Sequence, residues 1–524
     1  IKDYDQAVLL NSNYVLAYYN RGNAYYDKHD YDRAIANYDQ AIRLDSEYAL
    51  AYYDRGVSYF EKHDYAQALR DLSQAIKLDS KDALSWYNRG VVYAAMNEPD
   101  RAVADFDQSI KLDAKNGLAY FNRGLALRTK GQDERAIADF TQAIRFDAKN
   151  APAYFNRALA YRSRGELDRA LADLDQTIQI DGKNAAAFYE RGNARLQKRD
   201  YDGAIADLNT AINIKPDYTA AFNLRGLAYN AKGEGDRAIA DFDQALRIDP
   251  KFAAALSNRG DAFQKKHDYA RAIADFDQAI KANPGFAGAW LSRGLAERDK
   301  RDCQKAIADF SQALKLDAKN ADAYNARGAC YASLNDDDHA FQDFDAALTL
   351  RPNFGAAYFN RGMANYERHD YDHAVADLTQ AMRLDPRDIA AAHARGMAYR
   401  ERHDYDRAVA DFDTALKLDP KFTAGYVDRG NAYQHKGDYD RAVHDYDQAI
   451  KLDPKNASAF TERGNTYALR GKIDRALQDY EQAIKFNPNY AGVFNSRAML
   501  WKRKGDLTRA IADLDAAVKL DPNF

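Results

Sequence analysis

The residues whose types and spacing most readily suggest chemistry are arginine and aspartate, which recur together along the 524-residue chain. An Arg-Gly or Arg-Ala pair returns at one constant spacing from Arg21 to Arg497, and an aspartate follows each arginine at a second constant spacing, as Asp71 follows Arg55, except at Asn37. A row of guanidinium groups can bind anions, but the planar arginine fork also bonds a carboxylate and backbone carbonyls together. Because the pair is copied into every unit, we favour a structural ion pair that fixes how neighbouring units stack.

The histidines and cysteines do not form a catalytic or metal-binding set. His369 and His373 are the one histidine pair with i, i+4 spacing, and they stand on either side of an expected turn. The chain has no Cys-x-x-Cys, His-Glu-x-x-His or GxxxxGK[ST] segment, and neither Cys303 nor Cys330 has a matching base. We therefore expect no cofactor, no metal ion and no enzymatic activity.

The constant spacing of the Arg-Gly pairs defines the units that must position these groups. With residue 15 as position 1, fifteen repeats of equal length occupy residues 15–524 without insertion or deletion. They are residues 15–48, 49–82 and onward at the same spacing to 491–524. Residues 1–14 match positions 21–34 of a preceding repeat, so we expect them to form only its second helix.

Each repeat is predicted to form two amphipathic helices. In the first repeat, apolar residues at i, i+3, i+4 and i+7 predict helix A over residues 15–28 and helix B over residues 32–44. Asp30 is the expected N-cap of helix B. Position 20 is Ala in all fifteen repeats, while Gly at position 8 and Ala at position 27 each occur in thirteen. Such small residues let two helices approach closely, so we predict an all-α chain of tight helical hairpins.

These repeats resemble the tetratricopeptide repeat (TPR) family, whose unit is about 34 residues long, over essentially the whole chain. The shared features are an aromatic residue at position 4, Gly at 8, Tyr at 11, Ala at 20, Tyr or Phe at 24, Ala at 27 and Pro at 32. Arg at position 7 departs from the Leu that is usual in the family. The resemblance implies an α-solenoid, a right-handed superhelix of stacked helix-turn-helix hairpins, in which helices A line a concave groove. The segment Asp-Tyr-Asp-Arg-Ala-Ile resembles bacterial members of the family.

The groove-facing positions of helix A carry the residues that we expect to bind a partner. Position 5 is aromatic in repeats 1–6 and mixed afterwards, and position 6 is Asn in six repeats. An Asn amide both donates and accepts, so it can hold a peptide backbone, and the row resembles the asparagine ladder in the TPR superhelix of O-linked N-acetylglucosamine transferases. Two alternatives stay open, because the rings can instead pack between helices and the amides can bond locally. The candidate peptide-binding residues are Tyr19, Asn20, Tyr53, Tyr87, Asn88, Phe121, Asn122, Phe155, Asn156 and Tyr189.

The leading functional prediction is a non-enzymatic protein–protein interaction scaffold that binds extended peptide or helical segments in the groove. The alternative is a regulatory or substrate-recruiting arm of a larger enzyme whose catalytic domain lies outside this chain, and a third possibility is end-to-end self-assembly. Positions 2 and 5 carry no Lys, so we do not expect the carboxylate clamp by which some family members bind chaperone C-termini.

Composition narrows the partners to protein or peptide. A net charge of −4 gives no general attraction to nucleic acid or anionic membranes, and no apolar run reaches the roughly 18–20 residues of a membrane helix. Two cysteines favour a reducing compartment, and we expect a cytoplasmic protein. The first residues fall inside a hairpin, so we expect a piece of a longer protein. The ends, where Ile511, Leu514 and Val518 would face a further repeat, are predicted to associate weakly.

Overall fold

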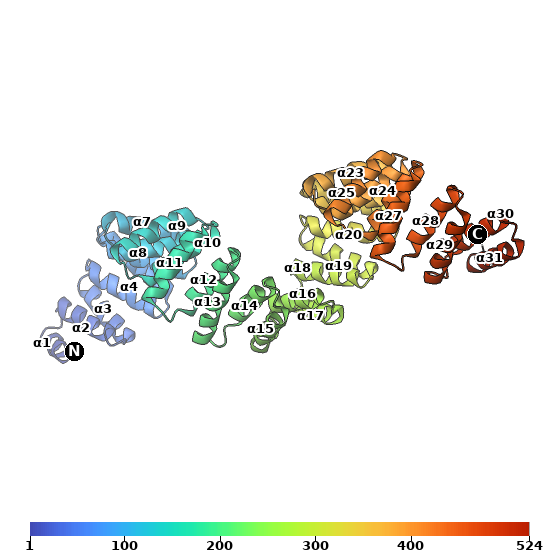
Figure 1. Ribbon diagram of the computed structural model, residues 1–524. Coiled ribbons are helices and arrows are strands. Elements are labelled where there is room, and N and C mark those ends of the chain that lie inside the picture. Colours follow the sequence, from blue (N-terminus) through green and yellow to red (C-terminus); the bar gives the residue numbers. More distant parts are fainter. Residues whose placement is uncertain (523–524) are drawn as a thin grey trace. The chain divides into compact units, whose positions relative to one another are not determined.

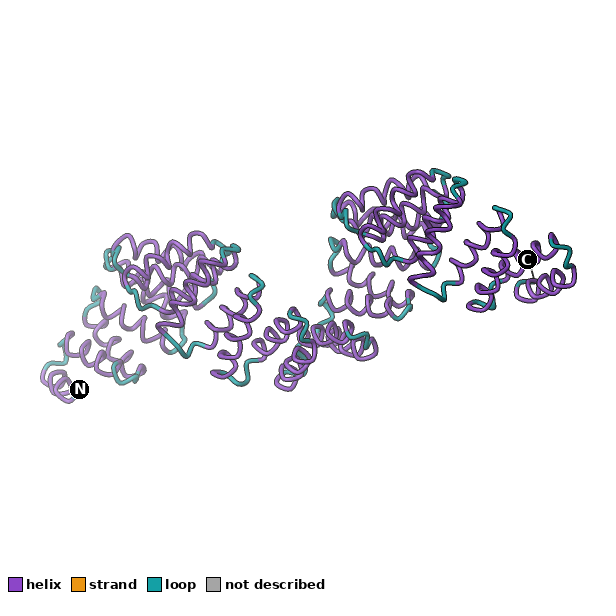
Figure 2. The backbone as a smooth tube through the Cα atoms, viewed as in Figure 1, coloured by secondary structure: helices purple, strands orange, loops and turns teal. Residues whose placement is uncertain are grey.

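The computed structural model describes residues 1–522, and these residues form helices joined by short turns (Figures 1 and 2). The chain consists of two compact units, Ile1–Ala262 and Phe263–Phe524. In the first unit the helices are α1 Lys2–Leu10, α2 Val15–Tyr26, α3 Tyr31–Leu44, α4 Ala49–Glu61, α5 Tyr65–Leu78, α6 Ala83–Ala95, α7 Pro99–Leu112, α8 Gly117–Thr129, α9 Asp133–Phe146, α10 Ala151–Ser163, α11 Leu167–Ile180, α12 Ala185–Gln197, α13 Tyr201–Ile214, α14 Thr219–Ala231, α15 Gly235–Ile248 and α16 Ala253–Lys265, which continues into the second.

The second unit repeats the same alternation of a 13-residue helix A and a 14-residue helix B. Its helices are α17 Tyr269–Ala282, α18 Ala287–Asp299, α19 Cys303–Leu316, α20 Ala321–Ser333, α21 Asp337–Leu350, α22 Gly355–Glu367, α23 Tyr371–Leu384, α24 Ile389–Glu401, α25 Tyr405–Leu418, α26 Thr423–His435, α27 Tyr439–Leu452, α28 Ala457–Leu469, α29 Ile473–Phe486, α30 Ala491–Arg503 and α31 Leu507–Leu520. Each unit is therefore an all-α solenoid of stacked hairpins, as the periodicity predicted.

The turn between helices A and B ends the first helix two residues earlier than predicted in repeat 1. The residue at position 15 has a positive φ, for example 59° at His29 and 70° at Gly131, which stops the helix there. Asp30 then accepts a hydrogen bond from the Arg33 N–H at 3.2 Å, and so caps α3. The histidines at position 15 are thus turn residues, and the His29 ring bonds the Tyr31 hydroxyl at 3.0 Å.

The small residues permit the close approach of helices A and B. Ala34 is fully buried, and a Cβ placed on Gly22 would lie 2.6 Å from a ring carbon of Tyr38. Carbon atoms in contact normally stand about 3.5–4.0 Å apart, so only Gly fits opposite this ring. In the thirteen repeats with Gly at position 8, the core of the hairpin is therefore an Ala and a Gly below a large side chain at position 24.

The stacking of repeats is fixed by the arginine at position 7. In repeat 4, Arg123 donates through Nε and Nη2 to both oxygens of Asp139 at 2.8 and 2.6 Å, and through Nη1 to Asp107 of the preceding repeat at 2.6 Å. Hydrogen bonds to Asp139 raise the pKa of the Arg123 guanidinium. The face of the guanidinium lies over the Tyr120 ring at 5.5 Å. The arginine row is therefore structural, because its donors are used within the chain.

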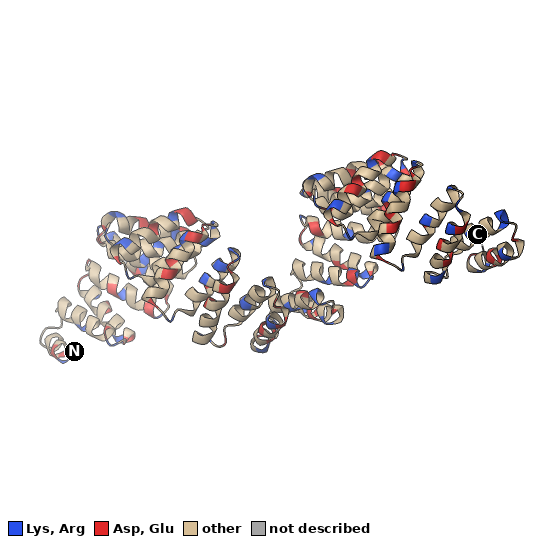
Figure 3. Ribbon diagram, in the orientation of Figure 1, with Lys and Arg blue, Asp and Glu red and all other residues tan. Residues whose placement is uncertain are grey.

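The hydrogen bond from Nη1 of the position-7 arginine to the preceding repeat recurs in repeats 1–14, at donor–acceptor distances of 2.5–3.2 Å. Its acceptor is always the side chain 16 residues before the arginine, and it is an Asp, Asn, Ser or Thr. Figure 3 shows the resulting mixture of acidic and basic residues on helices of both units. None of the helices in residues 1–522 is long and apolar enough to cross a membrane.

Candidate functional site

The candidate residues lie on one side of helices α2, α4, α6, α8, α10 and α12, which we call the A-face and define by positions 2, 5, 6 and 9 of repeats 1–6. All of these helices belong to the first unit. Positions 2, 5 and 9 share a helix side because they follow i, i+3 and i+7 spacing. Each of repeats 1–6 thus contributes the same four positions to the A-face.

The aromatic rings at position 5 are half-buried and contact the core of their own hairpin. Tyr87 packs against Phe106 with ring centroids 5.9 Å apart, and Phe121 packs against Phe140 at the same distance. Tyr19 lies 6.0 Å from Tyr38 in the same manner. The remaining position-5 rings, Tyr53, Phe155 and Tyr189, also pack against buried residues of their repeats. One side of each ring therefore belongs to the hairpin core.

Two of the four position-6 asparagines on the A-face bond to the residue at position 5 of the preceding repeat. Asn88 donates to the Tyr53 hydroxyl and Asn122 to the Tyr87 hydroxyl, both at 2.8 Å. Asn156 follows Phe121, which has no hydroxyl, and donates instead to its own Pro152 carbonyl at 2.9 Å. The Asn20 side chain makes no hydrogen bond within the described residues 1–522.

The hydrogen bonds between position 6 and position 5 of the preceding repeat form a polar ladder along the A-face. Other residue pairs occupy the same two positions in some repeats. Tyr19 donates to Asp54 at 2.7 Å, and burial raises the pKa of both groups. Burial likewise raises the pKa of Tyr53 to about 12, so its hydroxyl stays neutral and can both donate and accept. In the second unit, the His393 ring bonds Asp428 at 2.7 Å through the same pair of repeat positions.

An exposed row of leucines at position 2 is a feature that the sequence analysis did not count among the candidate residues. Leu16, Leu50, Leu84 and Leu118 are 49%, 50%, 51% and 59% exposed. They occur in four successive repeats, which is the signal that would have identified them. Contiguous exposed apolar surface on a soluble protein often marks an interaction site.

The A-face changes from apolar to charged toward repeat 6. Arg162 Nη1 lies 3.3 Å from Glu190 Oε2, and burial raises the pKa of the Glu190 carboxyl. At position 12, which is not one of the positions that define the A-face, Arg128 of repeat 4 has a buried Nε without a hydrogen-bond partner within the described chain. A bound segment that runs along repeats 1–6 would therefore meet leucines and rings first and charged groups last.

Catalytic and metal chemistry have no matching cluster in the described residues. Residues 1–522 contain no group of three or more His, Cys, Asp or Glu side chains that could hold a metal ion. The Cys303 sulfur accepts a hydrogen bond from Ser333 at 3.1 Å, and burial raises the pKa of the Cys330 thiol. A raised pKa disfavours the thiolate that a nucleophilic cysteine needs.

Comparison with protein families gives repeated matches to models described as TPR repeat and tetratricopeptide repeat. The first of these models matches residues 22–62, 56–97, 158–199, 192–233, 226–266, 396–437 and 430–470. Models described as tetratricopeptide repeat match residues 253–286, 457–490, 87–152, 293–354, 355–388, 140–172 and 491–524. No curated protein matches the chain.

Solved structures with similar folds share low sequence identity with this chain. A crystal structure of the APC/C hetero-tetramer Cut9–Hcn1 has a TM-score of 0.44 and 15% identity, over 85% of this chain and 95% of that one. Yeast Tom70 has a TM-score of 0.36 and 18% identity, over 84% and 96%. A tetratricopeptide repeat protein from Parabacteroides merdae has a TM-score of 0.41 and 19% identity, over 47% and 97%.

Proposed function

The chain belongs to the tetratricopeptide repeat family, and from this premise we propose that it is a non-enzymatic scaffold that binds extended peptide segments on the A-face of repeats 1–6. The observation that carries this proposal is the exposed leucine row beside the half-buried rings and asparagines. In repeats 1–4 this surface offers one exposed leucine and one polar side chain at position 6 in each repeat.

The polar ladder still has capacity for a ligand. Asn122 uses one amide N–H for Tyr87, which leaves its second N–H and its carbonyl oxygen for a peptide. Contacting helices stand about 8–10 Å apart, and an extended peptide advances about 3.3 Å per residue. The asparagines of the successive repeats 3–5 therefore meet about every third residue of an extended peptide, whatever the peptide's side chains are.

The test begins with twelve-residue peptides selected from a random displayed library on the full chain. We then measure Kd for the wild type and for the triple variant Leu50→Ser/Leu84→Ser/Leu118→Ser. Complete burial of a Leu side chain is worth about 1.5–3 kcal/mol, so half-exposed leucines contribute about 1 kcal/mol each. The triple variant should weaken binding about a hundredfold, since about 1.4 kcal/mol corresponds to tenfold in Kd.

The matched control replaces three leucines outside the A-face that are also exposed, though somewhat less so. Leu316, Leu350 and Leu418 are 46%, 41% and 38% exposed at the ends of B helices in the second unit. Their change to Ser should leave Kd within twofold. Equal losses in both triple variants, or undiminished binding by the A-face variant, would refute the proposal.

The asparagines have a separate expected signature. Asn122→Ala together with Asn156→Ala should weaken unrelated peptides by similar factors, because the contact is to the peptide backbone. Tyr87→Phe removes the internal acceptor of Asn122 without removing the ring, so it should leave the affinity unchanged or raise it. A loss confined to one peptide sequence contradicts the backbone contact.

A further inference from the structure

The aromatic ring at position 11 of helix A stands in a constant setting. Eleven of the fifteen repeats carry Tyr, Phe or Trp there. In nine of them an Arg at position 19 lies over the ring, with 4.1–5.6 Å between the guanidinium carbon and the ring centroid. In repeat 10 the same place holds a histidine, and His339 stacks on Tyr331 with centroids 5.0 Å apart and planes inclined by 26°.

Repeat 11 keeps this setting but lacks the ring. Position 11 is Asn365, which is only 8% exposed and donates to Asp377 at 3.2 Å. His373 at position 19 bonds Asp370 through Nδ1 at 2.7 Å, as His339 bonds Asp336 at 2.9 Å in repeat 10. His373 is therefore oriented like His339, but it has no ring to stack on.

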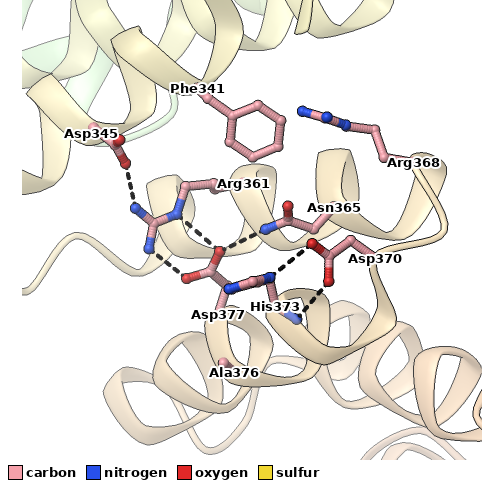
Figure 4. A pocket seen from close by; sticks show the side chains of 9 residues that line it. All are labelled: Phe341, Asp345, Arg361, Asn365, Arg368, Asp370, His373, Ala376 and Asp377. Atoms are coloured by element: carbon pink, nitrogen blue, oxygen red, sulfur yellow. Dashed lines mark hydrogen bonds and ion pairs between the residues drawn. The ribbon is translucent and has the colours of Figure 1, made fainter. Parts of the chain in front are cut away.

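A pocket of about 490 Å³ lies at this place, and its walls are suited to an aromatic ring (Figure 4). His373, Arg361 and Phe341 line it, and Arg368 lies 5.2 Å from the Phe341 ring centroid. Guanidinium and imidazole planes favour the faces of aromatic rings. The wall thus keeps the planar groups that elsewhere pack on the position-11 ring.

The missing ring explains the pocket. In the three other repeats without an aromatic residue at position 11, the place of the ring is either a pocket or filled by another side chain. Repeat 9 has Glu297 at position 11, and a pocket of about 350 Å³ lies there, lined by Ile273, Arg293 and Lys305 at the equivalent positions. In repeat 4 the buried Leu127 stands in the place of the ring, and in repeat 6 the Arg195 side chain does so and bonds Asp207 at 2.8 Å.

The acidic groups around the repeat-11 pocket are already paired, which disfavours a cationic ligand. Asp345 accepts from Arg361 at 2.5 Å, and Asp377 accepts from Arg361 at 2.6 and 2.9 Å. Asp370 accepts from His373. No carboxylate lining this pocket is left over for an ammonium group, whereas no aromatic ring of the described residues 1–522 stacks on the His373 ring.

We propose that this pocket is a socket for an aromatic side chain of a protein partner, which takes the place of the missing position-11 ring and stacks on His373. The socket lies in the second unit, apart from the A-face, and does not depend on peptide binding there. It gives the scaffold a second type of contact, in which a partner completes the packing of a repeat.

The probe for this socket is 4-methylphenol, which is the tyrosine side chain alone. The chain is labelled with ¹³C at the histidine Cε1, and the His373 signal is followed as the probe is added. We expect a saturable upfield shift with a Kd in the millimolar range, because stacking places the proton above a ring. The signal of His339, already stacked on Tyr331, serves as the reference for a covered ring. The aliphatic analogue 4-methylcyclohexanol should bind at least fivefold more weakly.

Asn365→Tyr is the decisive variant, because it restores the residue that most repeats carry and should not impair folding. It should raise the midpoint of thermal unfolding, move the His373 signal to the position of His339, and abolish the response to the probe. Tyr331→Asn should conversely make His339 respond. A His373 signal that does not shift at saturating probe, or that shifts equally in Asn365→Tyr, overturns the proposal, as does equal binding of the aliphatic analogue.

Discussion

Gly124→Ala should destabilise repeat 4 although alanine is the better helix former. A Cβ on Gly124 would lie 2.7, 2.9 and 3.1 Å from three ring carbons of Phe140, which is fully buried. Overpacking of this kind costs about 1–3 kcal/mol. The gain in helix propensity from Gly to Ala is about 1 kcal/mol. Because these distances are far inside contact distance, we take the upper part of that range, about 2–3 kcal/mol, which leaves a net loss of about 1–2 kcal/mol.

The companion change Phe140→Leu should reverse the sign of this effect. Repeat 5 has Ala158 at position 8 opposite Leu174 at position 24, and both side chains are buried. A methyl group and a leucine therefore fit where a glycine and a phenylalanine fit in repeat 4. In the Phe140→Leu background, Gly124→Ala should be neutral or stabilising, which gives a coupling energy of about 2 kcal/mol.

Native-state hydrogen exchange of the amides in α8 and α9 is the appropriate assay, since a nearest-neighbour array opens locally. Gly124→Ala should accelerate exchange there about tenfold and leave repeats 9–15 unchanged. The packing argument fails if Gly124→Ala slows exchange in these helices, or if the same loss persists in the Phe140→Leu background.

Three further predictions concern the ion pairs, the buried carboxylate and the ends. Arg123→Leu leaves Asp139, only 5% exposed, without its cation, so it should lower the stability of the α7–α8–α9 junction by about 2–3 kcal/mol. Adding Asp139→Leu to this variant should recover most of the lost stability. A loss of stability below about 0.5 kcal/mol, measured by hydrogen exchange, would contradict the structural role of the ion pair. Burial raises the folded-state pKa of Glu190 above its ordinary 4.5, so stability that is present below pH 4.5 is lost as the pH rises through the folded pKa. Glu190→Gln should remove this pH dependence of the stability of α12, and the variant should be more stable than the wild type at about pH 7. Parallel curves of stability against pH for the two proteins would contradict this. Ile511 and Val518 on α31 are 59% and 52% exposed, so the chain should associate weakly in sedimentation at rising concentration, and Ile511→Lys/Val518→Lys should abolish the association; an unchanged monomer at high concentration opposes this.

The hairpins could be predicted because their determinants are local and repeated. Gly22, Ala34 and Tyr38 specify one contact within a single hairpin, and the same pattern recurs at constant spacing. Helix bounds differed only at the turn, where helix A ends at Tyr26 and helix B begins at Tyr31, against predicted bounds of 28 and 32. The structural role of the arginines followed from their presence in every repeat.

The contacts of the A-face were less predictable, because they depend on how successive repeats are placed. The rings at position 5 contact position 24 of their own helix B, and Asn122 finds a tyrosine 35 residues earlier. Neither distance follows from the period of one helix. The second acceptor of each arginine, on the preceding repeat, was missed for the same reason. The socket at Asn365 was also not foreseen, since a single departure from a pattern shows its effect only when the surrounding side chains are in place.

The two kinds of link between repeats differ in how much they constrain the order of the units. The arginine link accepts any of several oxygen-bearing residues at one fixed separation, so it survives when a whole repeat is duplicated, deleted or exchanged. The links between positions 5 and 6 are specific to their pairs, as in Tyr19 with Asp54 or His393 with Asp428. A gene for this protein can therefore gain or lose units by unequal recombination without losing the stack, whereas each such event rewrites the polar ladder at the new junction. The number of repeats can thus change without loss of the stack, but each change alters the polar surface at one junction.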